Sequence, residues 1–212
     1  MKQLSILFVI TAILLSACSS KSHTEIEITF NEYKSAILNN GGEKSYSVID
    51  QKTKDYYSWL QKSSVNFTKD DIMKLGILDK MQIIIMRHRI PSQKLAKMTG
   101  KELFIHAVDN GWVGKNGVSK LGIGKIRVDN NFGTGEVSID GNPSSIYYHF
   151  HKENDKWKIG VMEMTKLGQV AISNQQKLSG KSEEEYIFLL TEIVSKKPVD
   201  RNTIYLPLNK PL

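Results

Sequence analysis

Residues 125–161 read KIRVDNNFGTGEVSIDGNPSSIYYHFHKENDKWKIGV, and this stretch decides the fold. Apolar and polar residues alternate along four short runs, as they do in strands that have one buried face. The runs are separated at 130–131, 141–143 and 153–155 by asparagine, glycine, aspartate and proline, which favour tight turns. The stretch therefore predicts an antiparallel meander of four strands with one apolar face.

The third run divides its side chains between two faces of the sheet. One face carries Ile146, Tyr148 and Phe150, which we expect in the core, and the other carries Tyr147, His149 and His151. The two histidines leave the strand on the same side, so they could flank a ligand or a metal ion with the tyrosine. A solvated strand face accounts for the same pattern. A zinc site would also need a third and usually a fourth ligand, which the sequence does not nominate.

Helical periodicity precedes the meander. Apolar residues recur at helical spacing over residues 29–38, 43–61 and 68–89, and a capping box at Thr99 predicts a further helix that ends near residue 110. Helices followed by an antiparallel meander predict an α+β domain in which the helices pack on one face of the sheet.

After the meander, residues 167–178 have a helical pattern, and Ser182 with Glu185 predicts the start of a last amphipathic helix. A proline-containing tail follows, and we expect it to be extended. The residues that we expect on the buried side of the last helix are Tyr186, Leu189, Leu190, Ile193 and Val194.

The amino terminus reads as a cleaved signal. Lys2 precedes an apolar run from Leu4 to Leu15, and two small residues come before Cys18, the only cysteine among 212 residues. The run is well short of the ~20 residues that a membrane-spanning helix needs. With no second cysteine in the chain, an internal disulfide is excluded, and the exported fold must be held by its core.

The segment Leu15-Ser16-Ala17-Cys18 resembles the lipobox of bacterial lipoproteins. The resemblance implies cleavage between Ala17 and Cys18 and lipidation of the Cys18 sulfur with acyl chains such as palmitate. Two or more chains anchor a protein stably. Ser19 replaces the aspartate that resembles an inner-membrane retention signal. This favours the outer membrane, facing the periplasm or the surface, in a host with two membranes. The alternative is an ordinary secretory leader with Cys18 as a free thiol.

The charge is modest and dispersed. The chain has 29 Lys and Arg, 22 Asp and Glu, and a formal net charge of +7, with no block of five or six basic residues. This pattern argues against a nucleic-acid partner and is compatible with contact to anionic lipid or cell wall. The run Arg87-His88-Arg89 ends a predicted helix, so we interpret it as cations beside the negative end of the helix dipole rather than as a phosphate site.

Residues 147–159, with Trp157-Lys158-Ile159 at their end, resemble the paired strands near the end of nuclear transport factor 2-like domains. Residues 45–60 are similar to the early helix of that superfamily. The resemblance implies a strongly curved antiparallel sheet wrapped around N-terminal helices, with an open cone-shaped cavity. The helical region over 70–110 is longer than a minimal member needs, and the segment after Thr165 has no counterpart in the basic fold.

These observations predict four segments: a signal peptide (1–17), a lipidated cysteine with a flexible tether (18–28), an α+β cone-like domain (29–165), and a C-terminal helical extension with its tail (166–212).

Members of this superfamily include isomerases and dehydratases, and also binding modules without catalysis. No catalytic motif carries over to a residue of this chain, and no cofactor is implied. We therefore expect a membrane-anchored, non-catalytic envelope lipoprotein that binds a protein partner or a small apolar ligand. The alternatives are a cavity enzyme of the isomerase or dehydratase type and a module that contacts cell wall or anionic lipid. Trp112, in a loop rich in glycine, is a candidate contact residue.

Overall fold

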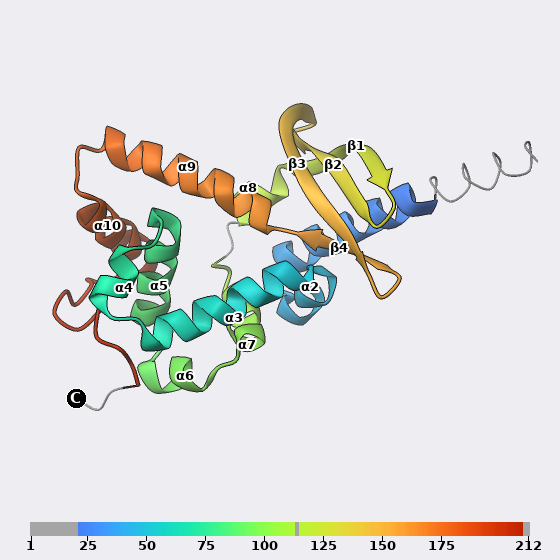
Figure 1. Cartoon of the computed structure of the whole chain (residues 1–212). Coiled ribbons are helices and arrows are strands. Elements are labelled where there is room, and N and C mark those ends of the chain that lie inside the picture. The colour runs from blue at the N-terminus through green and yellow to red at the C-terminus, as the bar shows by residue number, and fades with distance from the viewer. Residues whose placement is uncertain (1–20, 113–114, 210–212) are drawn as a thin grey trace, which may run out of the picture. The chain divides into compact units, whose positions relative to one another are not determined.

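A computed structural model of the chain describes residues 21–112 and 115–209. It contains an open four-stranded antiparallel sheet and several helices, which confirms the predicted α+β class (Figure 1). None of the helices within the described residues is both long enough and apolar enough to cross a bilayer.

The chain forms two compact units that alternate along the sequence. Unit 1 takes the described residues of Met1–Asp50 together with Ala107–Val161, and unit 2 takes Gln51–His106 together with the described residues of Met162–Leu212. The limits of the four segments expected from the sequence stay predictions.

The sheet belongs to unit 1 and is the predicted meander. Its strands follow the order β1-β2-β3-β4, and all neighbours are antiparallel. They are β1 (Leu121–Asp129), β2 (Phe132–Ile139), β3 (Asn142–Glu153) and β4 (Lys156–Gly160).

Two of the three hairpin turns have positive φ angles at both central residues. These are Asp140-Gly141, with φ of 50° and 82°, and Asn154-Asp155, with φ of 48° and 60°. This conformation matches the right-handed twist of the flanking strands, and glycine, asparagine and aspartate adopt it most readily. The second turn is one residue earlier than predicted, because Asn142 and Pro143 already pair with β2.

One face of the sheet is covered by a helix over residues 21–38 (Figure 1). The ring of Phe30 lies 5.4 Å from that of Tyr148, and Ile26 is fully buried. Gly133 permits this approach, because a Cβ there would lie 2.6 Å from the Cδ1 atom of Ile26. The helix includes residues 21–28, so the expected flexible tether is wrong for that part of it, and residues 18–20 lie outside the described residues.

A single helix was expected over residues 43–61, and the chain instead forms α2 (Gly42–Val48) in unit 1 and α3 (Gln51–Asn66) in unit 2. The break has a backbone cause. Ile49 forms a parallel bridge with Ile159, and the amide of Asp50 donates to the Ile159 carbonyl at 3.0 Å. These two residues pair with the edge of β4 and so leave the helical conformation.

Unit 2 is built around α5 (Ile77–Arg89), whose side chains Ile83 and Ile84 are fully buried. Helix α3 packs against α5, and so do α9 (Met162–Leu178) and α10 (Glu183–Ser195) (Figure 1). The other helices with residues in unit 2 are α4 (Lys69–Met73), α6 (Ser92–Lys97) and α7 (Gly100–Asp109). The predicted helix over 68–89 is therefore divided between α4 and α5.

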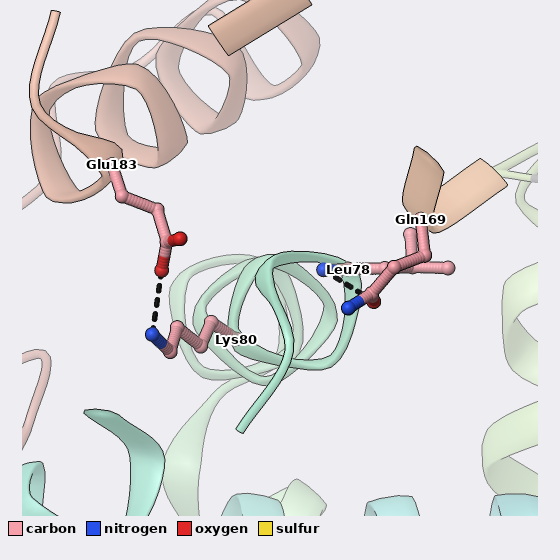
Figure 2. Close-up of polar contacts among 4 residues, drawn as sticks. All are labelled: Leu78, Lys80, Gln169 and Glu183. Carbon is pink, nitrogen blue, oxygen red and sulfur yellow. Dashed lines mark hydrogen bonds and ion pairs between the residues drawn. The ribbon is translucent and has the colours of Figure 1, made fainter. Parts of the chain in front are cut away.

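Two of the polar contacts between α5 and its neighbours lie near the N-terminal end of this helix. The backbone amide of Leu78 donates to Gln169 Oε1 of α9 at 3.3 Å, and Lys80 Nζ donates to Glu183 Oε1 of α10 at 2.5 Å. Figure 2 shows α5 held in this way on two sides. Gly76, just before α5, admits the Gln169 side chain, because a Cβ at this position would overlap its amide group.

The expected buried side of α10 is wrong for three residues. Leu189, Ile193 and Val194 are exposed, with Ile193 at 61%. The side chains that α10 buries are Tyr186, Ile187, Phe188 and Thr191. The apolar surface of α10 is thus wider than the surface its neighbours cover. The expected extended tail is wrong for residues 201–205, which form turns, and residues 210–212 lie outside the described residues.

Candidate functional site

The face of the sheet opposite the helix over 21–38 carries a group of exposed rings. Cross-strand pairs place Phe132 beside His151 and Thr134 beside His149, while the alternate residues of β2 and β3 face the helix. We call Phe132, Tyr147, His149 and His151 the aromatic face. The Phe132 ring lies 5.3 Å from the ring of His149 and 5.4 Å from the ring of His151.

The aromatic face is accessible to solvent. Phe132 is 38% exposed, Tyr147 is 39% exposed, and the side chain of His151 is 43% exposed. Large apolar rings gathered on one surface are a common sign of an interaction site. Strand alternation correctly places Tyr147, His149 and His151 on one face, with Tyr148 and Phe150 buried on the other. Ile146, which was also expected in the core, is only half-buried.

Phe132 was missed by sequence reasoning. It directly follows the Asn130-Asn131 turn, and alternation along β2 alone indicates its face. Its position opposite His151 depends on the register between β2 and β3, which includes an irregularity between Glu136 and Ser138. That irregularity has no local sequence signal.

A buried carboxylate lies beside the aromatic face. The Asp50 side chain is 3% exposed, and its Oδ2 atom lies 3.8 Å from His151 Nε2. This separation is longer than a hydrogen bond, so the two groups form an ion pair only when the imidazole is protonated. Gly160 makes room for the carboxylate, because a Cβ there would lie 2.8 Å from Asp50 Oδ2.

The chemistry open to this pair is limited. A histidine beside a carboxylate can accept and release a proton, which is the basis of general acid–base catalysis. Among residues 21–112 and 115–209, no group of three His, Cys, Asp or Glu side chains could hold a metal ion. The histidines of the aromatic face therefore gain no third protein ligand within the described chain.

Unit 1 also has a groove of about 810 Å³ between the end of the helix over 21–38 and α2. Asp109 closes one side, where its Oδ1 atom accepts from the amide of Gly42 at 2.8 Å. The lining is mainly polar or small: Asn31, Glu32, Ser35, Ala36, Asn39, Asn40, Gly41, Gly42, Glu43, Lys44, Ser47, Val48 and Asp109. It lacks the large aliphatic and aromatic side chains that usually line a site for a small apolar ligand.

The remaining predicted residues are Trp112, Ala17 and Cys18. Trp112 is half-buried, and its amide donates to the Ala107 carbonyl at 2.9 Å. Ala17 and Cys18 lie outside the described residues, so cleavage and lipidation stay predictions.

Arg87 has a structural role that the sequence did not indicate. Its Nε donates to the Ser64 carbonyl at 2.8 Å, Nη1 to that of Ile204 at 3.1 Å, and Nη2 to that of Phe67 at 2.6 Å. Burial lowers the pKa of this guanidinium to about 10, so it stays charged at neutral pH. Arg87 thus connects α5 to the end of α3 and to the C-terminal segment.

No family model, curated protein or solved structure matches this chain.

Proposed function

We propose that this chain is a membrane-anchored envelope lipoprotein whose aromatic face binds a protein partner without catalysis. The observation that carries the proposal is the exposure of Phe132 and Tyr147 on an ordered sheet. Aromatic side chains are enriched in the centres of protein interfaces, where they supply much of the binding energy. An open sheet face suits a protein surface better than a small molecule, which prefers an enclosed cavity.

The surroundings of the aromatic face support this assignment. Glu136 pairs with Tyr147, and Lys158 pairs with His151, so charged residues flank the rings. A polar rim around apolar anchors is the usual arrangement of a non-obligate protein interface. The two histidines add groups that can donate or accept hydrogen bonds to a partner.

A lipid anchor on Cys18 would place the start of the helix over residues 21–38 close to the bilayer. Only two residues separate Cys18 from residue 21, where the described helix is already present. At no more than ~3.6 Å per residue, this segment spans about 10 Å. The resemblance of Leu15-Ser16-Ala17-Cys18 to a lipobox supports the proposed location, which is the cell envelope and, in a host with two membranes, the outer membrane.

The finer resemblance to nuclear transport factor 2-like domains also remains a proposal. Its support is the order of elements in unit 1, where a helix that packs on one sheet face precedes a four-stranded meander. The helices of unit 2 interrupt this order between residues 51 and 106.

One observation favours a second candidate, a proton-transfer enzyme of the isomerase or dehydratase type. Asp50 is a buried carboxylate next to an accessible imidazole. Catalysis would require both groups, so activity on any substrate should fall by at least 100-fold in Asp50→Asn and in His151→Gln. A binding role for the face predicts that Asp50→Asn leaves partner binding within about threefold.

The proposed function can be tested in cells. We expect the wild-type protein, solubilised from membranes with mild detergent, to elute as a complex larger than the monomer. The double variant Phe132→Ser/Tyr147→Ser should elute as a monomer, because it removes both apolar anchors. Ile139→Ser is the matched control, since Ile139 is also exposed on β2 but has the opposite strand parity.

Two results would contradict the proposal. One is a wild-type protein that is monomeric under these conditions, and the other is a complex that survives the double variant. Cys18→Ser separates the anchor from the interface, because it should release the protein from the membrane fraction or block processing while the aromatic face stays intact.

A further inference from the structure

Unit 2 has a second surface that the proposed function does not use. It is a cleft of about 660 Å³ between the end of α5 and the C-terminal segment. We call it the basic cleft. Its lining residues are Arg87, His88, Arg89, Ile90, Pro91, Ser92, Lys197, Thr203, Ile204, Leu206, Pro207 and Leu208.

The ionisable groups of the basic cleft are all cationic or basic. Arg87, Arg89 and Lys197 carry positive charge, and His88 adds an imidazole whose Nε2 lies 3.0 Å from Ser195 Oγ. None of the described residues that line the cleft is Asp or Glu. The Thr203 hydroxyl donates to Asp200, which does not line it. Concave surfaces of one charge sign concentrate ions of the opposite sign.

Arg87 is held in place independently of any ligand. Its three hydrogen bonds to backbone carbonyls use three of the five N–H groups of a guanidinium. The positive charge is therefore fixed in the lining of the cleft without loss of side-chain entropy on binding.

Apart from Ser92 and Thr203, the rest of the lining is apolar. Ile90 and Ile204 are buried, while Leu206 is 44% exposed, and Pro207 and Leu208 follow it along the chain. A phosphate ion would leave these side chains uncovered, and a neutral apolar molecule would bring no negative charge to a lining whose ionisable groups are all basic. A ligand that complements the cleft needs an anionic group and an apolar chain.

We infer that the basic cleft binds an amphiphilic anion, a phosphate or carboxylate group that carries an alkyl chain. The volume lies within the range of ~300–1,000 Å³ that is usual for small-molecule sites. The anionic group lies near Arg89 and Lys197, and the chain lies along Leu206 and Pro207. This inference is independent of the aromatic face, because the two surfaces share no residue.

Titration calorimetry on the full purified chain tests the inference with dodecyl phosphate below its micelle concentration. We expect one binding site, with inorganic phosphate and dodecyltrimethylammonium each at least tenfold weaker. Lys197→Glu should weaken dodecyl phosphate at least tenfold. Lys196→Glu is the matched control, since it makes the same charge change one residue away and outside the cleft, and it should stay within about threefold.

A second variant tests the apolar half. Leu206→Ser should weaken dodecyl phosphate at least fivefold and leave the binding of inorganic phosphate within about twofold, because only the alkyl chain contacts this residue. The inference is overturned if dodecyltrimethylammonium binds as tightly as dodecyl phosphate, if inorganic phosphate does so, or if Lys197→Glu and Lys196→Glu weaken binding equally.

Vesicle flotation then distinguishes the two sources of such an anion. If the anion is a lipid headgroup in a bilayer, the Lys197→Glu variant should float less than the Lys196→Glu variant with phosphatidylglycerol vesicles. The two variants should float equally with phosphatidylcholine vesicles. If the anion is a free amphiphile, the two variants should float equally with both kinds of vesicle, while calorimetry still shows weaker binding of dodecyl phosphate to Lys197→Glu than to Lys196→Glu. Either pattern supports the assigned ligand class, and the loss of the calorimetric difference overturns it.

Discussion

Unit 1 covers its sheet on one side, whereas unit 2 packs helices around α5 on several sides. The helix over residues 21–38 covers the face that contains Phe150, and the opposite face keeps Phe132 and Tyr147 exposed. In unit 2 the surface proposed to bind a ligand is instead a cleft beside the end of α5. The uncovered sheet face of unit 1 therefore exposes aromatic side chains, whereas the surface at the end of α5 in unit 2 is lined by basic residues.

The largest expected effect tests whether the two units are energetically separable. Phe150 is fully buried in the sheet of unit 1. Phe150→Ala should destabilise unit 1 by about 3–5 kcal/mol, because it removes apolar contacts and leaves a cavity. Hydrogen exchange measured by mass spectrometry should show lost protection in β2, β3 and β4, with α5 and α10 protected as in the wild type. Equal loss in both units would show that they unfold together.

A corresponding change in unit 2 is Arg87→Met. It removes the hydrogen bonds to the carbonyls of Ser64, Phe67 and Ile204 and keeps much of the side-chain volume. We expect a loss of about 2–4 kcal/mol in the free energy of unfolding, because buried acceptors lose their partners. Urea denaturation measures it. A change below about 0.5 kcal/mol would contradict the structural role of Arg87.

Two glycine substitutions should act in opposite directions. Gly160→Ala places a Cβ 2.8 Å from Asp50 Oδ2 and should destabilise unit 1 by about 1–3 kcal/mol. Gly168→Ala lies within α9, where the added Cβ meets Leu78 at 3.7 Å, and should stabilise unit 2 by about 0.5–1 kcal/mol. Thermal unfolding should show these opposite shifts, and stabilisation by Gly160→Ala would contradict the close approach of Asp50.

The smallest expected effect concerns acid. Hydrogen bonds from the hydroxyl and the amide of Ser182 lower the pKa of the Glu185 carboxyl. The folded state therefore prefers the charged form, and this contribution is complete above the ordinary carboxyl pKa and is lost as the pH falls through the lowered value. Thr68 lowers the pKa of Asp71 in the same way.

We expect the first-turn amides of α4 and α10 to lose hydrogen-exchange protection as the pH falls below about 4, beyond the intrinsic change in exchange rate. Glu185→Gln should remove this pH dependence at α10 and leave it at α4. If α10 in Glu185→Gln keeps the same pH dependence as the wild type, the carboxylate of the capping box is not its cause.

Local sequence signals predicted the elements better than the surfaces. Alternation identified the strands, Asn154-Asp155 identified a turn, and Ser182 with Glu185 identified the start of α10, because each signal involves residues that are close in the chain. In contrast, the helix expected over residues 43–61 ends at Val48 because Ile49 pairs with Ile159, which is over a hundred residues away in the chain.

The candidate site also combines features that nearby residues predict with features that depend on contacts between distant parts of the chain. Strand parity placed His149 and His151 together, but the nearby carboxylate of Asp50 and the ring of Phe132 depend on tertiary register. Arg87 lies in a run of cations that resembles many helix ends, and only the folded chain reveals its three carbonyl partners. The exposed side of α10 shows that an apolar stripe does not specify how much of it a neighbour covers.

Photo-crosslinking in living cells tests the central claim most directly. A photoreactive phenylalanine analogue replaces Tyr147 on the aromatic face or, as the control, Asp155 in the hairpin turn of the same sheet. The proposed function predicts that position 147 yields one discrete protein adduct in the membrane fraction and that Phe132→Ser abolishes it, while position 155 yields none. Adducts of equal yield from both positions, or no adduct at position 147, would contradict the assignment of the aromatic face.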